Sequence, residues 1–441
     1  MLEKILRFIQ KLIPKKIYKL AQPVYHFLLA LLGSIIYKFP GNKIHIIMVT
    51  GTKGKSSTCE FVNAILEEDA KNINSSNYKI KTALLSTIRY KIDNDSKANT
   101  YKMTVPGRFF MQRFLRLAVN AKCKYAIIEM TSEGIRFYRH MFTNPDTLIF
   151  TNLTPEHIES HGNFEKYKAC KLELGKSVEN SKKEIRTIIS NTTDKYGLEF
   201  LNFNVDKKIK YTEEEIASIK ISIDGEFNKM NALAAKKFAL SINIREEVID
   251  RALLNLKKIP GRVQHIKIED ENKQQFEVIV DYAHTEDSLQ KIYKTYENNY
   301  IIGVLGSCGG GRDKIKRPIL GAIAQVYCNE IIITDEDPYD DDPIEIMQDI
   351  AKGINNFYQN NNYKIIEDRR LAIRYAITRA QKYLSTLPLE IIKTANIIPS
   401  KPIVIITGKG TDPYIMRARH KKEKWSDANV AKEELENIIL K

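Results

Sequence analysis

Residues 44–57 read IHIIMVTGTKGKSS, an apolar run that leads into a glycine-rich turn. From Thr58 to Leu66 the apolar residues recur with the spacing of an amphipathic helix. Glycine lets the backbone turn tightly and present its N–H groups to phosphate oxygens, and a helix N-terminus adds a partial positive charge at the same place. This order of strand, turn and helix predicts a nucleotide-binding loop. Its candidate residues are Gly51, Thr52, Lys53, Gly54, Lys55, Ser56 and Ser57.

Two side chains of this turn have the chemistry that a nucleoside triphosphate requires. Lys55 can reach the terminal phosphates, and the Ser56 hydroxyl can hold Mg²⁺. We therefore expect ATP and Mg²⁺ as cofactors. The spacing GTKGKSS is shorter than the general pattern GxxxxGK[ST], so an ordinary glycine-containing turn remains the alternative for this stretch alone.

The composition limits the class of protein. A length of 441 residues predicts two or three domains, and 43% hydrophobic residues can form sizeable cores. The net charge of +15 suggests nucleic acid, but the lysines are scattered without interleaved aromatic repeats, so we expect no nucleic-acid partner. Five cysteines without a CxxC pair argue against a zinc ribbon or a disulfide framework and predict a cytoplasmic location.

Residues 1–43 form a basic, apolar N-terminal segment that we expect to be helical. It contains eight Lys or Arg residues and one acid, Glu3, and its apolar run from Val24 to Tyr37 is too short to span a membrane comfortably. Contact with the inner membrane surface is one interpretation, because basic amphipathic segments lie on anionic bilayers. Packing against the following domain is the other.

Residues 44–260 alternate between strands and helices, which predicts an α/β domain with a mostly parallel sheet and helices on both faces. The expected strands are 44–49, 125–130, 147–151 and 187–190, and the expected helices include 109–121 and 231–241. Ligands bind at the carboxyl ends of such strands. Glu129 ends one strand, and Glu156 and His157 follow another, so Glu129 and His157 are candidate Mg²⁺ ligands.

Pro260-Gly261-Arg262 marks the expected boundary of a second α/β domain, residues 261–441. Its expected strands are 276–280, 300–305, 330–334 and 402–406. Each strand leads into a polar turn, which predicts a second binding face. For the acidic turn 335–342 we favour a cation-selective role over a solvated loop.

Eight motifs, in this order, resemble those of the Mur ligase family. TGTKGKSS is similar to its TGTNGKTT loop, TNLTPEHIESHGNFEKYKACK to its TNL-x-x-DHLDYHG segment, and GEFNKMNALAA to its G-x-FN-x-x-NALAA segment. GRVQHI, DYAHTEDSL, GGGRDKIKRP, DEDPYDDDP and GKGTDPY resemble the C-terminal domain of the MurE branch. The resemblance covers about residues 44–430 and implies a central P-loop ATPase-type domain followed by a Rossmann-like α/β domain.

The resemblance implies an ATP-dependent amide ligase that joins an amino acid to a carboxylate of a cell-wall muropeptide precursor through an acyl phosphate. Lys55 then neutralises charge on the transferred phosphoryl group. Ser56 and Glu129 are implied to hold one Mg²⁺, and His157 a second. Lys171 matches a lysine that is carbamylated in the family, which would make it an anionic oxygen ligand; unmodified, we expect a surface lysine.

Further residues are assigned by the same resemblance. Asn228 and Asn231 match positions near the adenine, and Asp281 and His284 match a turn that covers the nucleotide. Arg312 matches the arginine that binds the amino acid's α-carboxylate, for which a bidentate guanidinium is suited. Gly408 and Asp412 match positions that contact the far end of the amino acid. Thr104, Thr131 and Arg139 match positions that contact the acceptor.

The sequence departs from the family at both substrates. The family's N-terminal uridine-nucleotide-binding domain has no counterpart here, and residues 1–43 stand in its place, so the acceptor is expected to be either UDP-linked or lipid-linked. Enzymes that use meso-diaminopimelate carry Asp-Asn-Pro-Arg where this chain has Glu336-Asp337-Pro338-Tyr339. Together with Asp340 and Asp412, these carboxylates favour a side-chain ammonium, which predicts L-lysine or another basic diamino acid.

Two other interpretations stay open. A Mur-type ligase could act on a different polymer precursor, of the pseudomurein or poly-γ-glutamate type. A nucleotide-binding scaffold protein without catalysis is the other, although the candidate catalytic residues Lys55, His157, Lys171 and Arg312 are all present.

Overall fold

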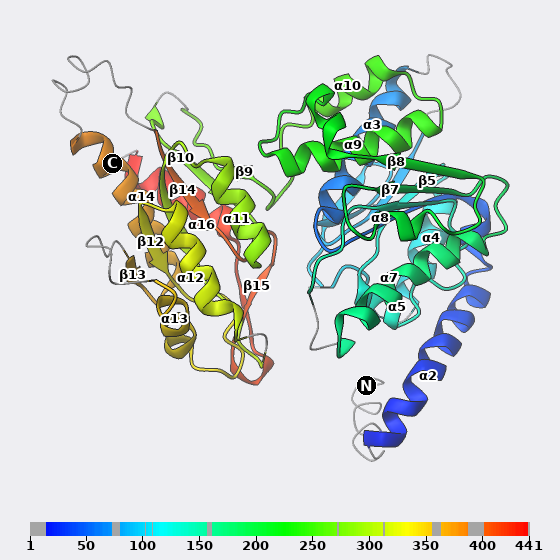
Figure 1. The fold of residues 1–441 in the computed structure, drawn as a ribbon, viewed down its shortest axis with the longest axis horizontal. Helices are drawn as coiled ribbons and strands as arrows, with labels where there is room; N and C mark the ends of the chain where they lie inside the picture. The colour runs from blue at the N-terminus through cyan, green and yellow to red at the C-terminus, as the bar shows by residue number, and fades with distance from the viewer. Residues whose placement is uncertain are drawn as a thin grey trace. The chain divides into compact units, whose positions relative to one another are not determined.

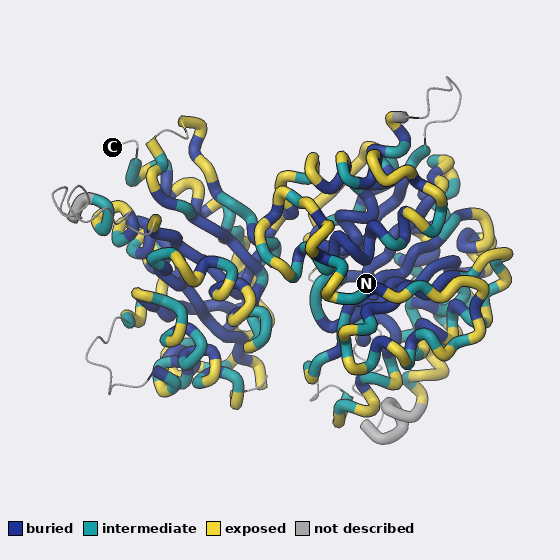
Figure 2. The backbone as a smooth tube through the Cα atoms, turned by 45° about the horizontal axis from the view of Figure 1, so that its top comes forward, coloured by how far each residue is buried: buried dark blue, intermediate teal, exposed yellow. Residues whose placement is uncertain are grey.

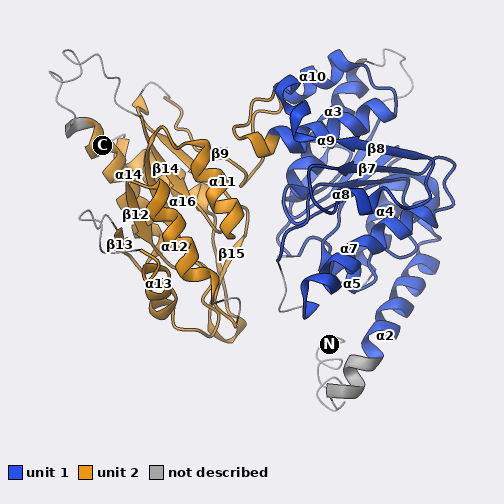
Figure 3. Ribbon diagram, viewed as in Figure 1, with its two compact units in different colours: residues 1–220, 229–255 blue, residues 221–228, 256–441 orange. Residues whose placement is uncertain are grey.

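The computed structural model describes residues 15–72, 80–101, 103–107, 109–156, 161–270, 273–311, 314–354, 363–386 and 401–439. The chain divides into two compact units (Figure 3). Unit 1 comprises residues 1–220 and 229–255, and unit 2 comprises residues 221–228 and 256–441. His157 and Arg312, two of the candidate catalytic residues, lie outside the described residues.

Unit 1 is built on an eight-stranded sheet with the order β4-β3-β2-β5-β1-β6-β7-β8. The strands are β1 (His45–Thr50), β2 (Thr82–Leu85), β3 (Arg89–Ile92), β4 (Asp95–Ala98), β5 (Tyr125–Glu129), β6 (Thr147–Phe150), β7 (Thr187–Asn191) and β8 (Lys207–Tyr211). Neighbouring strands pair in parallel along β2-β5-β1-β6-β7-β8. At one edge, β3 pairs antiparallel with β2, and β4 pairs antiparallel with β3. The mostly parallel α/β fold is therefore confirmed, whereas β2, β3, β4 and β8 were not predicted.

Helices cover both faces of this sheet (Figure 1). They are α2 (Lys15–Ile36), α3 (Lys55–Asn72), α4 (Phe110–Asn120), α5 (Ser132–Arg136), α7 (Phe164–Glu179), α8 (Gly197–Phe200), α9 (Glu226–Ser241) and α10 (Glu246–Asn255), with short 3-10 turns at Pro40–Lys43 and Glu213–Ser218. One face packs against α4, α5 and α7 through Phe114, Ile135 and Leu174. The central strands are buried on both sides, which explains why β1 reads as a continuous apolar run (Figure 2).

Unit 2 has a six-stranded sheet with the order β13-β12-β11-β14-β10-β9. Its strands are β9 (Gln264–His265), β10 (Glu277–Val280), β11 (Tyr300–Leu305), β12 (Glu330–Ile333), β13 (Tyr363–Ile365) and β14 (Pro402–Ile406), and a separate hairpin joins β15 (Tyr414–Met416) to β16 (Lys422–Lys424). The helices are α11 (Glu286–Thr295), α12 (Lys316–Tyr327), α13 (Pro343–Ala351), α14 (Arg369–Thr386) and α16 (Asp427–Ile439), with a 3-10 turn at Ala418–His420. Its core cluster joins α14 and α16 to the sheet.

The N-terminal segment contains the helix α2, which contains most of the predicted apolar run. No helix among the described residues combines the length and the apolar character that crossing a bilayer requires. The helix packs on the rest of unit 1 through ring contacts of Phe27 with Tyr138 and Phe142.

Candidate active site

The glycine-rich turn lies between β1 and α3 and requires glycine at two positions. Gly54 has a φ of 81°, and a Cβ atom there would lie 2.1 Å from Asn231 Oδ1 on α9. A Cβ atom on Gly51 would lie 1.9 Å from Thr151 Oγ1. The close approach of the neighbouring side chains therefore fixes the loop in one shape.

The end of β6 holds this loop in place. The Asn152 side-chain oxygen accepts from the Lys53 backbone N–H at 2.8 Å, and the Thr151 hydroxyl donates to the Lys53 carbonyl at 2.6 Å. The Lys53 ammonium pairs with Glu156 at 2.9 Å. Thr151 and Asn152 thus position the phosphate loop.

The loop fits a nucleotide phosphate chain. The first turn of α3 begins at Lys55, and the N–H groups of a first helical turn have no intrahelical acceptor. The Lys55 ammonium lies over the loop and donates to the Thr52 carbonyl at 2.8 Å. Backbone donors, a helix N-terminus and one cation therefore converge where phosphate oxygens would lie.

Hard oxygen donors meet beside the loop. The Ser56 hydroxyl donates to Glu129 Oε2 at 2.8 Å, and both side chains are buried. Thr87 donates to the same carboxylate through its backbone N–H at 2.8 Å and its hydroxyl at 3.0 Å. A hydroxyl and a carboxylate are the ligands that Mg²⁺ takes, so Ser56 and Glu129 fit the ion that would neutralise phosphate charge. The described residues contain no group of three or more His, Cys, Asp or Glu side chains that could hold a metal ion.

Lys171 is a correction to the sequence-based expectation. It lies on α7 and is 1% exposed, so it is not a surface lysine even without modification. Its ammonium donates to the Gly51 carbonyl at 2.8 Å, directly behind the phosphate loop. Burial, reinforced by the charge of Lys55, holds the pKa of Lys171 well below its usual range. A neutral amine is the form that can react with carbon dioxide to give a carbamate.

The three candidate acceptor residues lie in unit 1. The Thr104 hydroxyl lies 2.7 Å from the Thr87 hydroxyl, which connects it to Glu129. Thr131 caps the N-terminus of α5 by accepting from the Gly134 N–H at 3.2 Å. Arg139 donates to the Val105 carbonyl and lies over the Phe137 ring at 5.3 Å. Thr104 is thus linked through Thr87 to Glu129, the candidate Mg²⁺ ligand, whereas Thr131 and Arg139 have local structural partners.

The candidate nucleotide residues divide between the two units. Asn231 lies against Gly54 in unit 1, whereas Asn228 belongs to the segment 221–228 of unit 2 and donates to the Asp224 carbonyl at 2.7 Å. Asp281 follows β10 and accepts from the Val263 and Ala283 N–H groups, each at 2.8 Å. His284 Nδ1 lies 2.8 Å from the Tyr282 carbonyl oxygen. Asp281 therefore fixes the turn that carries His284.

The carboxylates of the predicted amino-acid pocket are not equivalent. Asp337 accepts from the buried Lys409 ammonium at 2.8 Å and from the Met416 N–H at 2.7 Å, so its charge is already compensated. Asp340 accepts from the Arg419 N–H at 2.7 Å, and Asp412 lies 3.4 Å from the Lys409 ammonium. The sequence-based prediction considered only the carboxylates, and the structure adds the buried Lys409 ammonium, which pairs with Asp337 and lies near Asp412.

Glu336 differs from these neighbours. It is buried at 3% exposure, and its Oε2 atom has no hydrogen-bond partner among the described residues. Its other oxygen accepts from the Cys308 thiol at 3.1 Å. Gly408, with a φ of 107°, lies so close that a Cβ atom there would be 2.4 Å from Glu336 Oε2. Tyr339 also has a positive φ, 54°, and its N–H donates to the Met416 carbonyl at 3.0 Å.

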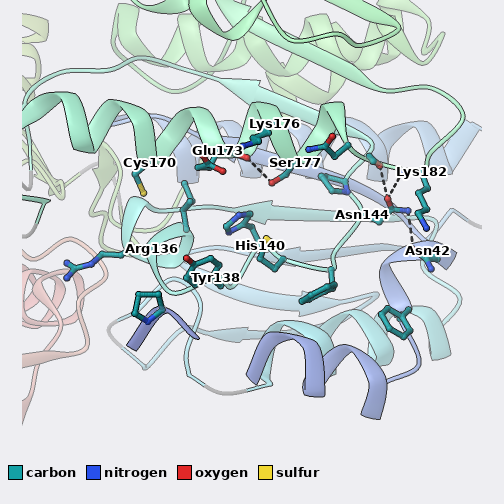
Figure 4. Close-up of a pocket in the computed structure, with 18 of the residues that line it drawn as sticks. Asn42, Arg136, Tyr138, His140, Asn144, Cys170, Glu173, Lys176, Ser177 and Lys182 are labelled. Atoms are coloured by element: carbon teal, nitrogen blue, oxygen red, sulfur yellow. Dashed lines mark hydrogen bonds between the residues drawn. The ribbon is translucent and has the colours of Figure 1, made fainter. Parts of the chain in front are cut away.

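A separate groove of about 930 Å³ lies in unit 1 along α7 (Figure 4). It is lined by Cys170, Glu173 and Ser177 of α7 on one side and by Arg136, Tyr138 and His140 on the other. None of the predicted nucleotide, metal or substrate residues lines it. Lys171 points to a different face of the same helix, because successive helical residues are rotated by about 100°.

Sequence reasoning missed three residues of these sites. Thr87 lies two residues after the end of β2, a strand that the sequence did not predict. The Tyr167 hydroxyl lies 3.1 Å from the Thr52 hydroxyl, and its sequence position on α7 gave no signal of that contact. Lys409 stood inside the quoted motif GKGTDPY, where a cation between Gly408 and Asp412 could have indicated the pairing.

Two family descriptions match the chain. The Mur ligase middle domain matches residues 49–215, and the Mur ligase, glutamate ligase domain matches residues 261–385. A UDP-N-acetylmuramoyl-L-alanyl-D-glutamate–2,6-diaminopimelate ligase from Syntrophomonas wolfei is 30% identical over 93% of this chain and 82% of its own length. A UDP-N-acetylmuramyl-tripeptide synthetase from Borrelia garinii is 30% identical over 92% of this chain and 79% of its own length.

The fold agrees with these relatives. A solved structure of a UDP-N-acetylmuramoyl-L-alanyl-D-glutamate–2,6-diaminopimelate ligase matches 90% of this chain and 79% of that chain, with a TM-score of 0.56 and 22% identity. At that identity the match supports the fold alone. The two family matches and the two relatives carry the assignment further: this chain belongs to the Mur ligase family of ATP-dependent amide ligases.

Proposed function

We propose that this ligase joins a basic diamino acid, L-lysine above all, to a carboxylate of a muropeptide precursor. ATP supplies the energy by converting that carboxylate to an acyl phosphate, which the incoming amine attacks with release of phosphate. The relatives named for diaminopimelate and for tripeptide synthesis support the muropeptide class of acceptor.

In this proposal Ser56 and Glu129 hold Mg²⁺, and Lys55 binds the terminal phosphates. Their support is the contact of 2.8 Å between Ser56 and Glu129 and the position of Lys55 at the start of α3. We extend the proposal to Lys171 as a carbamate, because its amine is buried and adjacent to the loop and because its lowered pKa favours the neutral form. His157 and Arg312 keep their proposed roles as metal ligand and α-carboxylate ligand.

Glu336 carries the choice of amino acid. A buried carboxylate oxygen without a partner costs free energy unless a donor reaches it. A substrate ammonium is such a donor, whereas the second carboxylate of meso-diaminopimelate would add like charge. Tyr339 stands where diaminopimelate enzymes carry arginine, and it offers no positive charge to the second carboxylate of meso-diaminopimelate.

The experiment measures phosphate release and product mass with ATP and Mg²⁺. L-lysine, L-ornithine and meso-diaminopimelate are each tested against UDP-linked and lipid-linked muropeptide acceptors, with Lys55→Ala as the inactive control. We expect turnover with L-lysine and one of the acceptors. Preference for meso-diaminopimelate would reject the specificity, and absence of turnover with every pair would reject the muropeptide acceptor.

Two variants test the specificity in the same assay. Glu336→Gln keeps the shape of the side chain but removes its charge, so kcat/KM for L-lysine should fall by about tenfold or more. Tyr339→Arg restores the arginine of the diaminopimelate enzymes and should raise the relative use of meso-diaminopimelate. If neither ratio changes, these two residues do not read the amino-acid side chain.

A further inference from the structure

The outer face of α2 is an apolar stripe that is exposed in the part of unit 1 that the structure describes. Five side chains form it, and their exposed fractions are 60% for Val24, 55% for Leu28, 48% for Leu32, 53% for Ile35 and 52% for Ile36. The spacing of three and four residues places them on one side of the helix. We call these five residues the α2 stripe.

The opposite face of α2 is firmly attached, so the stripe is not a result of a detached helix. His26 packs on Phe137 with ring centroids 4.8 Å apart, and Phe27 packs on Phe142 at 5.4 Å. Gly33 lies so close to Phe109 that a Cβ atom would be 2.7 Å from its ring. The helix is thus fixed with one apolar face inward and a second apolar face outward.

Along the sequence, the residues that flank the stripe carry charge of one sign. Residues 4–59 contain no Asp or Glu, and neither does α4, which packs beside α2. Eight Lys or Arg residues lie within residues 1–43. Arg116 of α4 binds the Tyr37 carbonyl at the C-terminal end of α2 with a distance of 2.6 Å, which adds a cation there.

We propose that the α2 stripe docks unit 1 on an anionic lipid bilayer. An apolar stripe beside acid-free basic sequence meets both components of such a surface, because the acyl chains take the leucine and isoleucine side chains and the headgroups take the lysines. A second copy of the chain fits less well, since dimerisation through this face would oppose two sets of like charges. This docking does not depend on the amino acid or acceptor of the ligase reaction.

Vesicle co-flotation of the full chain tests the docking. The probes are vesicles of phosphatidylcholine alone and vesicles that also contain about 30% phosphatidylglycerol. We expect binding to the anionic vesicles and weaker binding as salt is raised, because headgroup attraction is screened. Failure to bind the anionic vesicles at low salt overturns the proposal.

A matched pair of variants assigns the binding to the stripe. Leu28→Asp/Leu32→Asp should lower the vesicle partition coefficient at least about tenfold, since it removes two apolar contacts and adds like charge to an anionic surface. Leu198→Asp is the control, because Leu198 is 62% exposed on α8 and lies outside the stripe. Equal loss in both variants, or loss in neither, contradicts the assignment to α2.

Other occupants of the stripe give different results. Size-exclusion chromatography with light scattering that shows a dimer dissociated by Leu28→Asp/Leu32→Asp, without vesicle binding, assigns the stripe to a second copy. A tryptophan introduced by Leu32→Trp reports contact directly: brominated phosphatidylglycerol in the vesicles should quench it. If its emission is already blue-shifted in a monomer without lipid, another segment of the chain covers the stripe, and the proposal is overturned.

Discussion

The properties of Lys171 come from its position, because a lysine of ordinary sequence context becomes a buried amine behind the phosphate loop. Among the described residues its ammonium donates to the Gly51 carbonyl at 2.8 Å and pairs with no carboxylate, so its charge is not compensated directly. The lowered pKa follows from burial first and from Lys55 second. Chemistry that needs a free amine is therefore favoured at this residue.

Lys171→Arg should abolish carbamate formation while keeping a long cationic side chain. We expect wild-type protein to show a carbamate signal by ¹³C NMR in labelled bicarbonate and the variant to lack it. Ligase activity should fall about 10- to 100-fold, the range for losing a group that supports a metal site. Full activity in the variant would mean that Lys171 acts only by packing.

Glu129→Gln should weaken Mg²⁺ use specifically. Both carboxylate oxygens accept hydrogen bonds, from Ser56 and Thr87, so the amide cannot replace them without losing an acceptor. The Mg²⁺ concentration for half-maximal phosphate release should rise about tenfold. Glu173→Gln, exposed on α7, is the control and should leave the Mg²⁺ dependence unchanged.

Elements of unit 2 are joined by a buried ion pair near the candidate amino-acid site. Arg369 at the start of α14 binds Asp427 at the start of α16 through two contacts of 2.8 and 2.7 Å. The same guanidinium donates to the Asp335 carbonyl at 3.0 Å and the Thr407 carbonyl at 2.8 Å. These two carbonyls immediately precede Glu336 and Gly408, so the pair fixes the ends of β12 and β14.

Asp427→Ala should destabilise unit 2 by about 3–5 kcal/mol, because it leaves a buried guanidinium without its counter-charge. Chemical denaturation followed by far-UV circular dichroism measures the change. Glu433→Gln is the matched control: it breaks the partly exposed pair with Arg370 and should cost less than about 1 kcal/mol. Similar costs for both variants would show that burial does not dominate the pair at Asp427.

The segment 221–228 is attached to the rest of unit 2 by a titratable contact. His265 on β9 lies 3.0 Å from Asp224 and 3.2 Å from Glu277. The hydrogen bond to Asp224 and then that to Glu277 raise the pKa of His265 to about 9. The partner contact lowers the pKa of Glu277 to about 2.

The stability of unit 2 should therefore fall at alkaline pH. A histidine whose pKa is raised on folding contributes fully below its unfolded pKa of about 6.5, and the contribution is lost as pH rises through about 9. Because the pair is partly exposed and screened, we expect a loss of about 1–2 kcal/mol. Melting temperatures from pH 6 to 10 measure it. His265→Gln should flatten this dependence, whereas the exposed His420→Gln should retain it.

At the scale of the whole molecule, the described residues of each unit contain one large sheet with its own hydrophobic core cluster. The core clusters of unit 1 and unit 2 share no residue. The chain passes between the units at residues 220–221, 228–229 and 255–256. Each unit therefore has the apolar interior that independent unfolding requires.

Calorimetry should resolve two unfolding transitions, and Mg–ATP should raise the one that belongs to unit 1. At a ligand concentration of about 100 times Kd the stabilisation is about 2.7 kcal/mol. Lys55→Ala should remove this shift, and His265→Gln should lower only the transition of unit 2. A single transition that all these changes move together would show that the units unfold as one.

Much of the α/β architecture could be predicted, because buried parallel strands appear in the sequence as continuous apolar runs of strand length. β11 and β14 have the predicted bounds, and β1 is shifted by one residue. The edge strands β3 and β4 were not predicted, since the partly exposed residues of β3 and the exposed residues of β4 lack that continuous apolar pattern. Ser56 and Glu129 could be placed together because the carboxyl ends of parallel strands meet at one edge of a sheet.

By itself the sequence determined the order of the elements, the phosphate loop and the residue types of the site, since these depend on local pattern and spacing. Only the tertiary structure decided that Lys171 is buried and that α2 turns an apolar face outward. It also decided that Lys409 pairs with Asp337, whereas Glu336 Oε2 has no hydrogen-bond partner among the described residues. Burial and the choice of an ionic partner depend on residues far away in the chain. No local spacing encodes them, because packing brings those residues together only in the folded protein.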